Sequence, residues 1–167
     1  FVNGLASRFQ EQGGEILTGT KVRGFELAGR RIESVETSRG GFHPDKVVLA
    51  AGAWSPGVAR DLKLKLPVQP AKGYSITFDA LEGVIPFPIM LAEARMGVTP
   101  LGPRMRLAGT LELSGINLDI KDRRVDALRR GPARYFNSVL ERTNEQVWCG
   151  MRPLSPDGLP IIGVPVG

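Results

Sequence analysis

Arg152 is the residue whose type and place in the chain best suit the binding of a carboxylate. It follows residues 146–150, an apolar segment that we predict to be a strand, and Pro153 stiffens the backbone directly after it. A guanidinium held in this way presents a planar fork of N–H donors to the two oxygens of a carboxylate. An ordinary surface arginine, or an ion-pair partner of Asp157, explains the position as well, and all three interpretations stay open at this point.

A turn of small residues at Gly52 is the second candidate for ligand binding. The strand predicted over residues 46–51 is apolar without alternation after its first residue, which indicates burial on both faces, as in a parallel sheet. Open α/β sheets bind ligands at the carboxyl ends of such strands, and the helix start predicted at Ser55 and Pro56 offers free N–H groups to an anion. A tight strand–helix turn without a ligand is an equally good interpretation.

Histidine and cysteine are too few to build a metal cluster or a nucleophilic dyad. The chain has one cysteine, Cys149, in an apolar segment, and one histidine, His43, in a predicted turn. This excludes an internal disulfide, a multi-ligand metal site and Ser–His or Cys–His catalysis. We interpret Cys149 as a buried, unreactive thiol.

The charge pattern does not favour nucleic acid as a partner. The net charge is +5, but the basic residues are interspersed with acidic ones, as Arg123, Arg124, Arg129 and Arg130 are with Asp122 and Asp126. No aromatic residues alternate with a basic stripe, so a solvated helix face is the better interpretation. A composition of 42% hydrophobic and 23% charged residues is typical of a globular protein, and no apolar run approaches the length of a membrane span.

Two prolines, Pro67 and Pro70, enforce an extended crossing that divides the chain. Before it, the patterns predict a helix that ends at Gly13 and Gly14, a short strand over residues 15–18, a hairpin of residues 22–27 and 32–38, the strand over 46–51 and a helix through residues 55–62.

After the crossing, Tyr74, Ile76 and Phe78 alternate with polar residues, which predicts a half-buried strand of an antiparallel or mixed sheet. The other elements expected there are a hairpin of residues 96–99 and 105–108, a helix over 122–142 that Gly131 and Pro132 split, the strand over 146–150, and a loop or fraying end over 153–167.

Four motifs carry a resemblance to a known family, and they occur in that family's order and spacing. They read AAGAWS at residues 50–55, KGYSIT at 72–77, RLAGTLE at 106–112 and WCGMRPLSPDGLPIIG at 148–163. Together they cover nearly the whole chain, and the last is the most specific. The chain resembles the bacterial FAD-dependent D-amino-acid dehydrogenases, which belong to the wider D-amino-acid oxidase (DAO) family.

The resemblance implies a fold, a division into domains and a set of site residues. The fold is of the α+β / α/β class: a mixed, largely antiparallel substrate-domain sheet with helices on one face, plus part of a Rossmann-like FAD-binding domain. The domains are a partial FAD-binding domain (1–66), a substrate-binding domain (67–153) and a return segment toward the FAD domain (154–167). Substrate contacts fall to Arg152, for the α-carboxylate, and to Gly97; FAD contacts fall to Val22, Ala51, Gly52, Trp54, Gly158, Pro160, Ile161 and Gly163.

The activity implied is oxidative deamination of a small D-amino acid to a 2-oxo acid, with hydride transfer from the substrate Cα to the flavin. The cofactor supplies the redox chemistry, so the protein mainly has to hold and orient the substrate. The resemblance further implies that electrons pass to a carrier such as a quinone. It also implies that the protein is cytoplasmic and bacterial, with peripheral contact to the inner membrane, which a basic surface favours.

Three departures from the family pattern matter. The G-x-G-x-x-G fingerprint that holds the FAD pyrophosphate is absent from the chain, and so is the glycine-rich segment that follows the last motif in the family. Oxidases of the family carry a tyrosine where this chain has Gly97, which favours the dehydrogenase branch. We therefore expect the isolated chain of 167 residues to bind FAD weakly or not at all, and a stoichiometric flavin absorbance band in the purified chain would contradict this.

Two other functions compete with this interpretation. Within the superfamily, a glycine- or sarcosine-type amine oxidase or a 2-hydroxyacid oxidoreductase would show the same motifs, and oxygen consumption would separate the oxidases. In another class, a non-catalytic binding or assembly module would explain why the chain has no self-sufficient catalytic set.

Overall fold

The computed structural model describes residues 1–79, 85–136 and 142–164, and these form two compact units. The first unit contains Phe1–Ala50 and Gly57–Lys65, and the second contains Ala51–Pro56 and the chain from Leu66 onward. The end of the first unit coincides with the extended crossing expected near Pro67. The assignment of these parts to FAD and substrate binding stays a prediction.

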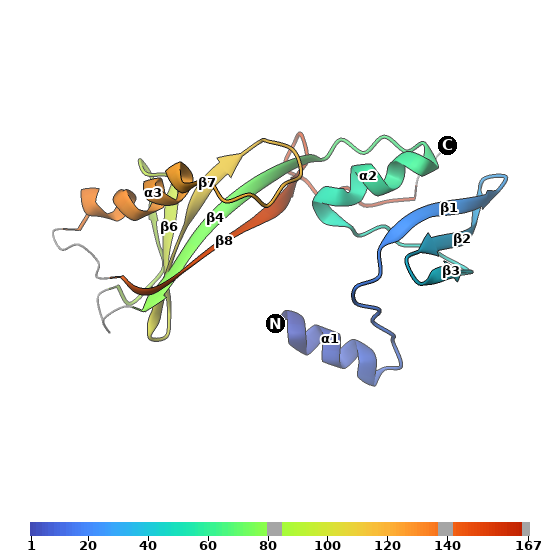
Figure 1. Cartoon of the computed structure of the whole chain (residues 1–167), viewed down its shortest axis with the longest axis horizontal. Helices are drawn as coiled ribbons and strands as arrows, with labels where there is room; N and C mark the ends of the chain where they lie inside the picture. Colours follow the sequence, from blue (N-terminus) through green and yellow to red (C-terminus); the bar gives the residue numbers. More distant parts are fainter. Residues whose placement is uncertain (80–84, 137–141, 165–167) are drawn as a thin grey trace. The chain divides into compact units, whose positions relative to one another are not determined.

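The first unit is built from one helix, a small antiparallel sheet and a short helical segment (Figure 1). Helix α1 (Val2–Glu11) ends before Gly13, as expected. The predicted hairpin is confirmed as β1 (Val22–Ala28) and β2 (Arg31–Thr37), and a third strand, β3 (Gly40–Phe42), pairs with β2. The turn η1 (Gly52–Trp54) belongs to the second unit, and helix α2 (Ser55–Ala59) begins there and continues into the first unit, where η2 (Arg60–Leu62) follows.

Two strands predicted in this part of the chain are not formed. Residues 15–18 and 46–51 belong to no strand, and Val48 is 87% exposed. An apolar run becomes a buried strand only where neighbouring strands bond to its backbone and cover its sides. No strand of the described residues pairs with either segment, so the apolar pattern alone gave the wrong prediction.

The second unit is organised around a five-stranded sheet with the strand order β5-β6-β7-β4-β8 (Figure 1). Every neighbouring pair is antiparallel, which confirms the predicted α+β fold with a largely antiparallel sheet and the predicted hairpin of β6 and β7. The strands are β4 (Gln69–Asp79), β5 (Ile89–Leu91), β6 (Met96–Leu101), β7 (Arg104–Glu112) and β8 (Thr143–Leu154).

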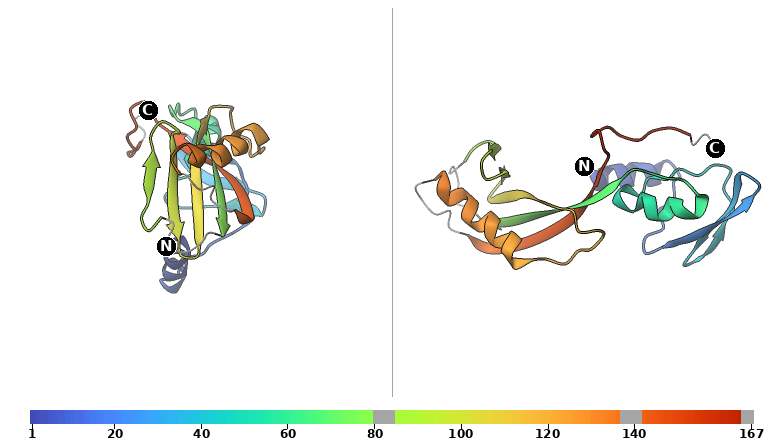
Figure 2. Two further views of the ribbon diagram at one scale, coloured as in Figure 1. Left: turned by 90° about the vertical axis from the view of Figure 1, so that its left-hand side faces the viewer. Right: turned by 90° about the horizontal axis from the view of Figure 1, so that it is seen from above.

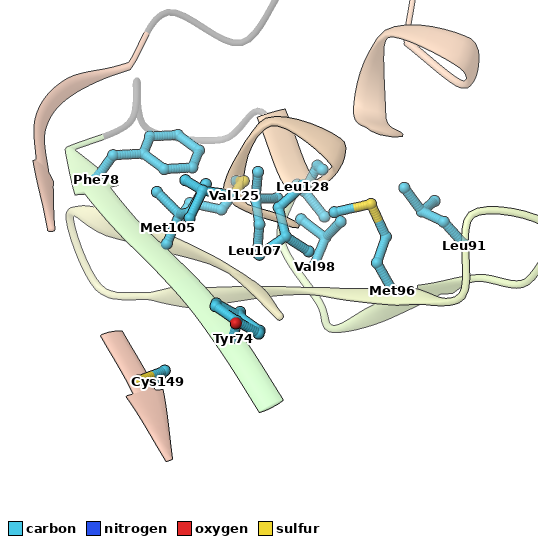
Figure 3. Close-up of a cluster of buried hydrophobic side chains, with 12 residues drawn as sticks. Tyr74, Phe78, Leu91, Met96, Val98, Met105, Leu107, Val125, Leu128 and Cys149 are labelled. Atoms are coloured by element: carbon cyan, nitrogen blue, oxygen red, sulfur yellow. The ribbon is translucent and has the colours of Figure 1, made fainter. Parts of the chain in front are cut away.

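Helix α3 (Asp122–Arg130) covers one face of this sheet and packs on β4 and β7 (Figure 2). Its Val125 and Leu128 lie over Leu107 and Val98, while Tyr74 and Cys149 lie at the other end of the same core (Figure 3). Cys149 is buried as predicted, and its thiol donates to the carbonyl of Leu118 at 3.2 Å.

The helix predicted over residues 122–142 is shorter than expected. It ends at Arg130 and continues only as the 3₁₀ turn η3 (Gly131–Arg134), because Pro132 cannot supply an internal helical N–H. Phe136, beyond this turn, is not helical but packs against the core, whereas Val139 and Leu140 lie outside the described residues. The basic face of α3 is not simply solvated, because Arg129 pairs with Asp126 at 2.9 Å and with Glu145 at 2.7 Å.

Strand β4 is buried on both faces, whereas alternation predicted a half-buried strand. Tyr74, Ile76 and Phe78 point into the core under α3, but Ser75 and Thr77 on the other face are also buried. The strand is central, between β7 and β8, and Arg106 of β7 donates a hydrogen bond to the Thr77 hydroxyl at 3.0 Å. Polarity is therefore a poor guide to burial in a central strand.

A buried cluster of charged and polar groups joins two of the sequence motifs. Lys72 is 0% exposed, and its Nζ donates to Asn117 Oδ1 at 2.5 Å and to the carbonyl of Asp119 at 2.8 Å. The Nζ lies 3.7 Å from Glu112 Oε1, and the Tyr74 hydroxyl donates to Glu112 Oε2 at 3.0 Å. The cluster anchors the segment after β7 to the sheet, which gives the motif residues Lys72, Tyr74 and Glu112 a structural role.

Glu112 makes the stability of the cluster depend on pH. The hydrogen bond from Lys121 Nζ, at 2.5 Å, is the largest of several effects that lower the pKa of Glu112 from 4.5 to about 2. A carboxyl with a lower pKa in the folded state stabilises the fold fully above its unfolded pKa. This contribution is lost as the pH falls from about 4.5 through about 2.

We therefore expect Glu112→Gln to be less stable than the wild type at pH 7 and to approach it below pH 4. Urea denaturation of both proteins across this range measures the difference. A difference that stays constant from pH 7 to pH 2.5 would contradict the assigned role of the Glu112 carboxylate.

Candidate substrate site on the face opposite the helix

The face of the sheet opposite α3 brings together residues from all five strands, and we refer to it as the opposite face. Side chains alternate along a strand, and directly paired residues share a face. One row across this face is made by Met90, Gly97, Ala108, Ser75 and Trp148, from β5, β6, β7, β4 and β8 in turn. The neighbouring positions on β4 and β8 are the pairs Gly73–Gly150 and Ala71–Arg152. Away from the two edges, the row carries only small side chains, whereas the exposed Leu111 of β7 pairs with Gly73 on the same face.

Arg152 projects onto this face and bends back along it. A Cβ placed on Gly73 would lie 3.5 Å from the Arg152 Cζ, so the guanidinium lies over the backbone of Gly73. Among the described residues, no hydrogen bond or ion pair engages the guanidinium. Asp157, the alternative ion-pair partner, instead accepts a hydrogen bond from the Leu159 N–H at 3.0 Å. An exposed guanidinium over a small-residue floor is well placed to bind an anionic ligand.

Trp148 lies beside Arg152 on the same strand and was not singled out by the sequence analysis. Its indole occupies the space that a Cβ on Gly150 would fill, so the ring can take this position only because residue 150 is glycine. The ring is 64% exposed. The signal that could have found it is the period of two in β8, where Trp148, Gly150 and Arg152 all point to one face.

This contact predicts different outcomes for two glycine substitutions. Gly150→Ala is expected to displace the indole, whereas Gly73→Ala places a methyl group at ordinary contact distance, 3.5 Å, from the guanidinium. We expect a change in the near-ultraviolet circular dichroism of tryptophan for Gly150→Ala and little change for Gly73→Ala. Equal spectra for the two variants would show that the indole does not lie on Gly150.

Gly97 shares the opposite face with Arg152 but lies three strands away, across about 14 Å of sheet. A Cβ at this position would be 3.9 Å from the Ala108 carbonyl oxygen, so packing does not require a glycine here. A small ligand held by Arg152 would meet a residue at position 97 only through a long side chain. Glycine leaves that space open, and its contact with substrate stays a prediction.

The residues predicted to meet FAD lie on both units. Val22 begins β1 in the first unit, whereas Ala51, Gly52, Trp54 and the segment 158–163 belong to the second. The turn η1, which contains Gly52 and Trp54, packs on β4 and β8. Pro160 and Ile161 are exposed in the loop after β8.

Glycines in these segments fit the close approach of a cofactor. Gly52 and Gly158 have φ values of +53° and +76°, which favour glycine, and nothing lies within 4 Å of a Cβ added to either or to Gly163. A dinucleotide approaches such backbone without meeting a side chain, so these residues fit FAD. Their assignment to particular parts of FAD stays a prediction.

The described residues show neither a metal site nor a membrane-spanning helix. No group of three or more His, Cys, Asp or Glu side chains could hold a metal ion among residues 1–79, 85–136 and 142–164. Over the same ranges, no helix is long and apolar enough to cross a bilayer.

Comparison with known proteins places these motifs in one family. The whole chain, residues 1–167, matches the DAO family, described as FAD dependent oxidoreductase. Among curated relatives, the D-amino acid dehydrogenases of Cereibacter sphaeroides and Agrobacterium fabrum are 34% and 36% identical over 165 residues. In each case 98% of this chain is aligned, but it covers only 38% and 40% of the relative.

Solved structures show the same fold at lower sequence identity. Glycine oxidase from Geobacillus kaustophilus superposes with a TM-score of 0.85 at 23% identity, over 95% of this chain and 43% of that protein. L-proline dehydrogenase from P. horikoshii superposes with a TM-score of 0.79 at 22% identity, over 96% of this chain and 45% of that protein. Since the family match extends from the first residue to the last, the chain belongs to the DAO family of FAD-dependent oxidoreductases.

Proposed function

We propose that the protein containing this chain oxidatively deaminates D-amino acids to 2-oxo acids with FAD as its cofactor. The observation that carries the proposal is the Arg152 guanidinium, which lies on the opposite face without a partner among the described residues. The names of the relatives at 34% and 36% identity support the choice of D-amino acids. The resemblance of the KGYSIT motif to the dehydrogenase branch supports it as well.

In this proposal the chain's own residues bind and orient the substrate. Arg152 holds the α-carboxylate through two parallel N–H···O hydrogen bonds, which fixes the direction of the bond from the carboxylate to Cα. Gly73 and Gly150 have no side chains, so the Arg152 guanidinium and the Trp148 indole can lie directly on the sheet, and the substrate would bind above these two groups. Toward Gly97 the row continues through the buried Ser75 and through Ala108, and the absence of a side chain at Gly97 would leave room for the substrate.

FAD would be held by Val22, Ala51, Gly52, Trp54, Gly158, Pro160, Ile161 and Gly163, and when bound it supplies the acceptor for a hydride from the substrate Cα. Loss of a proton from the amino group then leaves an imino acid, which water hydrolyses to the 2-oxo acid and ammonia. We further propose a quinone or a similar carrier as the final electron acceptor and a cytoplasmic location with peripheral membrane contact.

The test is a substrate panel with the FAD-loaded, full-length protein. D-amino acids, their L enantiomers, glycine, sarcosine and 2-hydroxy acids are offered with an artificial electron acceptor, and oxygen consumption is recorded in parallel. We expect 2-oxo acid and ammonia from D-amino acids and little oxygen uptake. Preferential turnover of glycine or sarcosine with oxygen, or of a 2-hydroxy acid, would replace this proposal with one of the related activities.

A further inference from the structure

We propose that Trp148 is the wall against which the substrate's side chain packs, and therefore a residue that determines which amino acids are accepted. This rests on the proposed function, because it takes Arg152 as the anchor of the substrate carboxylate.

The geometry brings the indole and the guanidinium together. Their residues are four positions apart on β8, but the two side chains bend toward each other along the strand. The guanidinium lies over Gly73, and the indole lies over Gly150. Gly73 and Gly150 are directly paired across β4 and β8, so the two groups lie over backbone positions about 5 Å apart.

A cation beside an exposed aromatic ring suits one class of ligand. The Cα of an amino acid is bonded directly to its carboxylate carbon. When the guanidinium holds the carboxylate, the first side-chain atoms of the ligand therefore come within reach of the indole ring. Trp148 is not part of the hydrophobic core under α3, so its apolar surface has no cover from that cluster. An apolar substrate side chain would cover it and gain both burial and ring contact. The ligand class is therefore a carboxylate with a bulky apolar side chain.

The kinetic test compares substrates that differ in side-chain size. The FAD-loaded, full-length protein and its Trp148→Ala, Trp148→Phe and Leu27→Ala variants are assayed with D-phenylalanine and D-alanine. We expect Trp148→Ala to lower the ratio of kcat/KM for D-phenylalanine over D-alanine by about tenfold, and Trp148→Phe to retain most of it. Leu27→Ala removes an exposed apolar side chain from β1, which is not part of the five-stranded sheet, and should leave the ratio unchanged. An equal loss for both substrates in Trp148→Ala would overturn the proposal.

A binding measurement without turnover separates this proposal from the proposed function. Calorimetry with benzoate and acetate compares a carboxylate that reaches the ring with one that does not. We expect Trp148→Ala to weaken benzoate binding by about tenfold and to leave acetate unchanged, whereas Arg152→Ala weakens both. If these results hold but no amino acid is oxidised, the proposed function fails, whereas the proposed role of Trp148 in ligand binding is supported. If wild-type protein shows no preference for benzoate, or Trp148→Ala retains it, the wall is overturned whatever the enzyme oxidises.

Discussion

Replacing Arg152 with alanine is expected to lower kcat/KM for D-amino acids by about 30-fold to several thousand-fold, mainly through a higher KM. This range corresponds to about 2–5 kcal/mol, the usual cost of removing one partner from a desolvated charge pair. The substrate carboxylate would lose both of its hydrogen bonds, and the chain offers no second described cation over Gly73. Steady-state kinetics of the FAD-loaded, full-length protein give KM and kcat separately.

Two further proteins sharpen this prediction. Arg106→Ala removes another cation from the opposite face, but the Arg106 Nε already donates to Thr77 Oγ1 at 3.0 Å, so we expect a much smaller rise in KM. Arg152→Lys keeps the charge but loses the planar fork of donors, so its KM should lie between those of the wild type and Arg152→Ala. If Arg106→Ala and Arg152→Ala raise KM equally, the face acts through its overall charge and Arg152 is not the carboxylate anchor.

Replacing Lys72 with alanine is expected to lower the free energy of unfolding by about 3–5 kcal/mol, since this breaks a buried ion pair by removing one partner. Lys72 is fully buried, and its loss leaves Asn117 Oδ1 and the carbonyl of Asp119 without their donor. The segment that joins β7 to α3 would lose its main attachment to β4. Urea denaturation of the full-length protein measures the change.

The matched control is Lys65→Ala, which removes the same charge from an exposed position. It should change the unfolding free energy by no more than about 0.5 kcal/mol. Lys72→Met is a second variant, because it restores the volume of the side chain but not its donors. If Lys72→Ala is as stable as Lys65→Ala, the buried cluster contributes specificity of packing rather than stability.

The sequence predicted the antiparallel sheet well because the information that forms it is local. The alternation of Tyr74, Ile76 and Phe78 and the turn between β6 and β7 each lie within a few residues. The run at residues 46–51 failed for the opposite reason, since an apolar pattern cannot show whether partner strands are present. The burial of Ser75 and Thr77 also depends on neighbours that are distant in the sequence.

Only part of the candidate site could be predicted. Arg152 stands out in the sequence because it follows the predicted strand over residues 146–150 and precedes a proline, and the resemblance gave it a role. In the structure β8 runs on to Leu154, so Arg152 and Pro153 lie within the strand. The orientation of its guanidinium depends on Gly73, which is 79 positions earlier and is brought beside it by the pairing of β4 with β8. The same pairing across the sheet, together with the missing Cβ of Gly150, sets the position of Trp148. No pattern within β8 alone carries that information.

Strand β8 supplies candidate site residues on one face and core residues on the other, and this limits how its length can change. Trp148, Gly150 and Arg152 point to the opposite face, whereas Val147 and Cys149 point to the core. Inserting or deleting a single residue between Gln146 and Arg152 would exchange the two sets, pushing a tryptophan or a charge under α3 and a thiol onto the surface. Homologous chains should therefore differ here by substitution, or by gaps of two residues, and hardly ever by a gap of one.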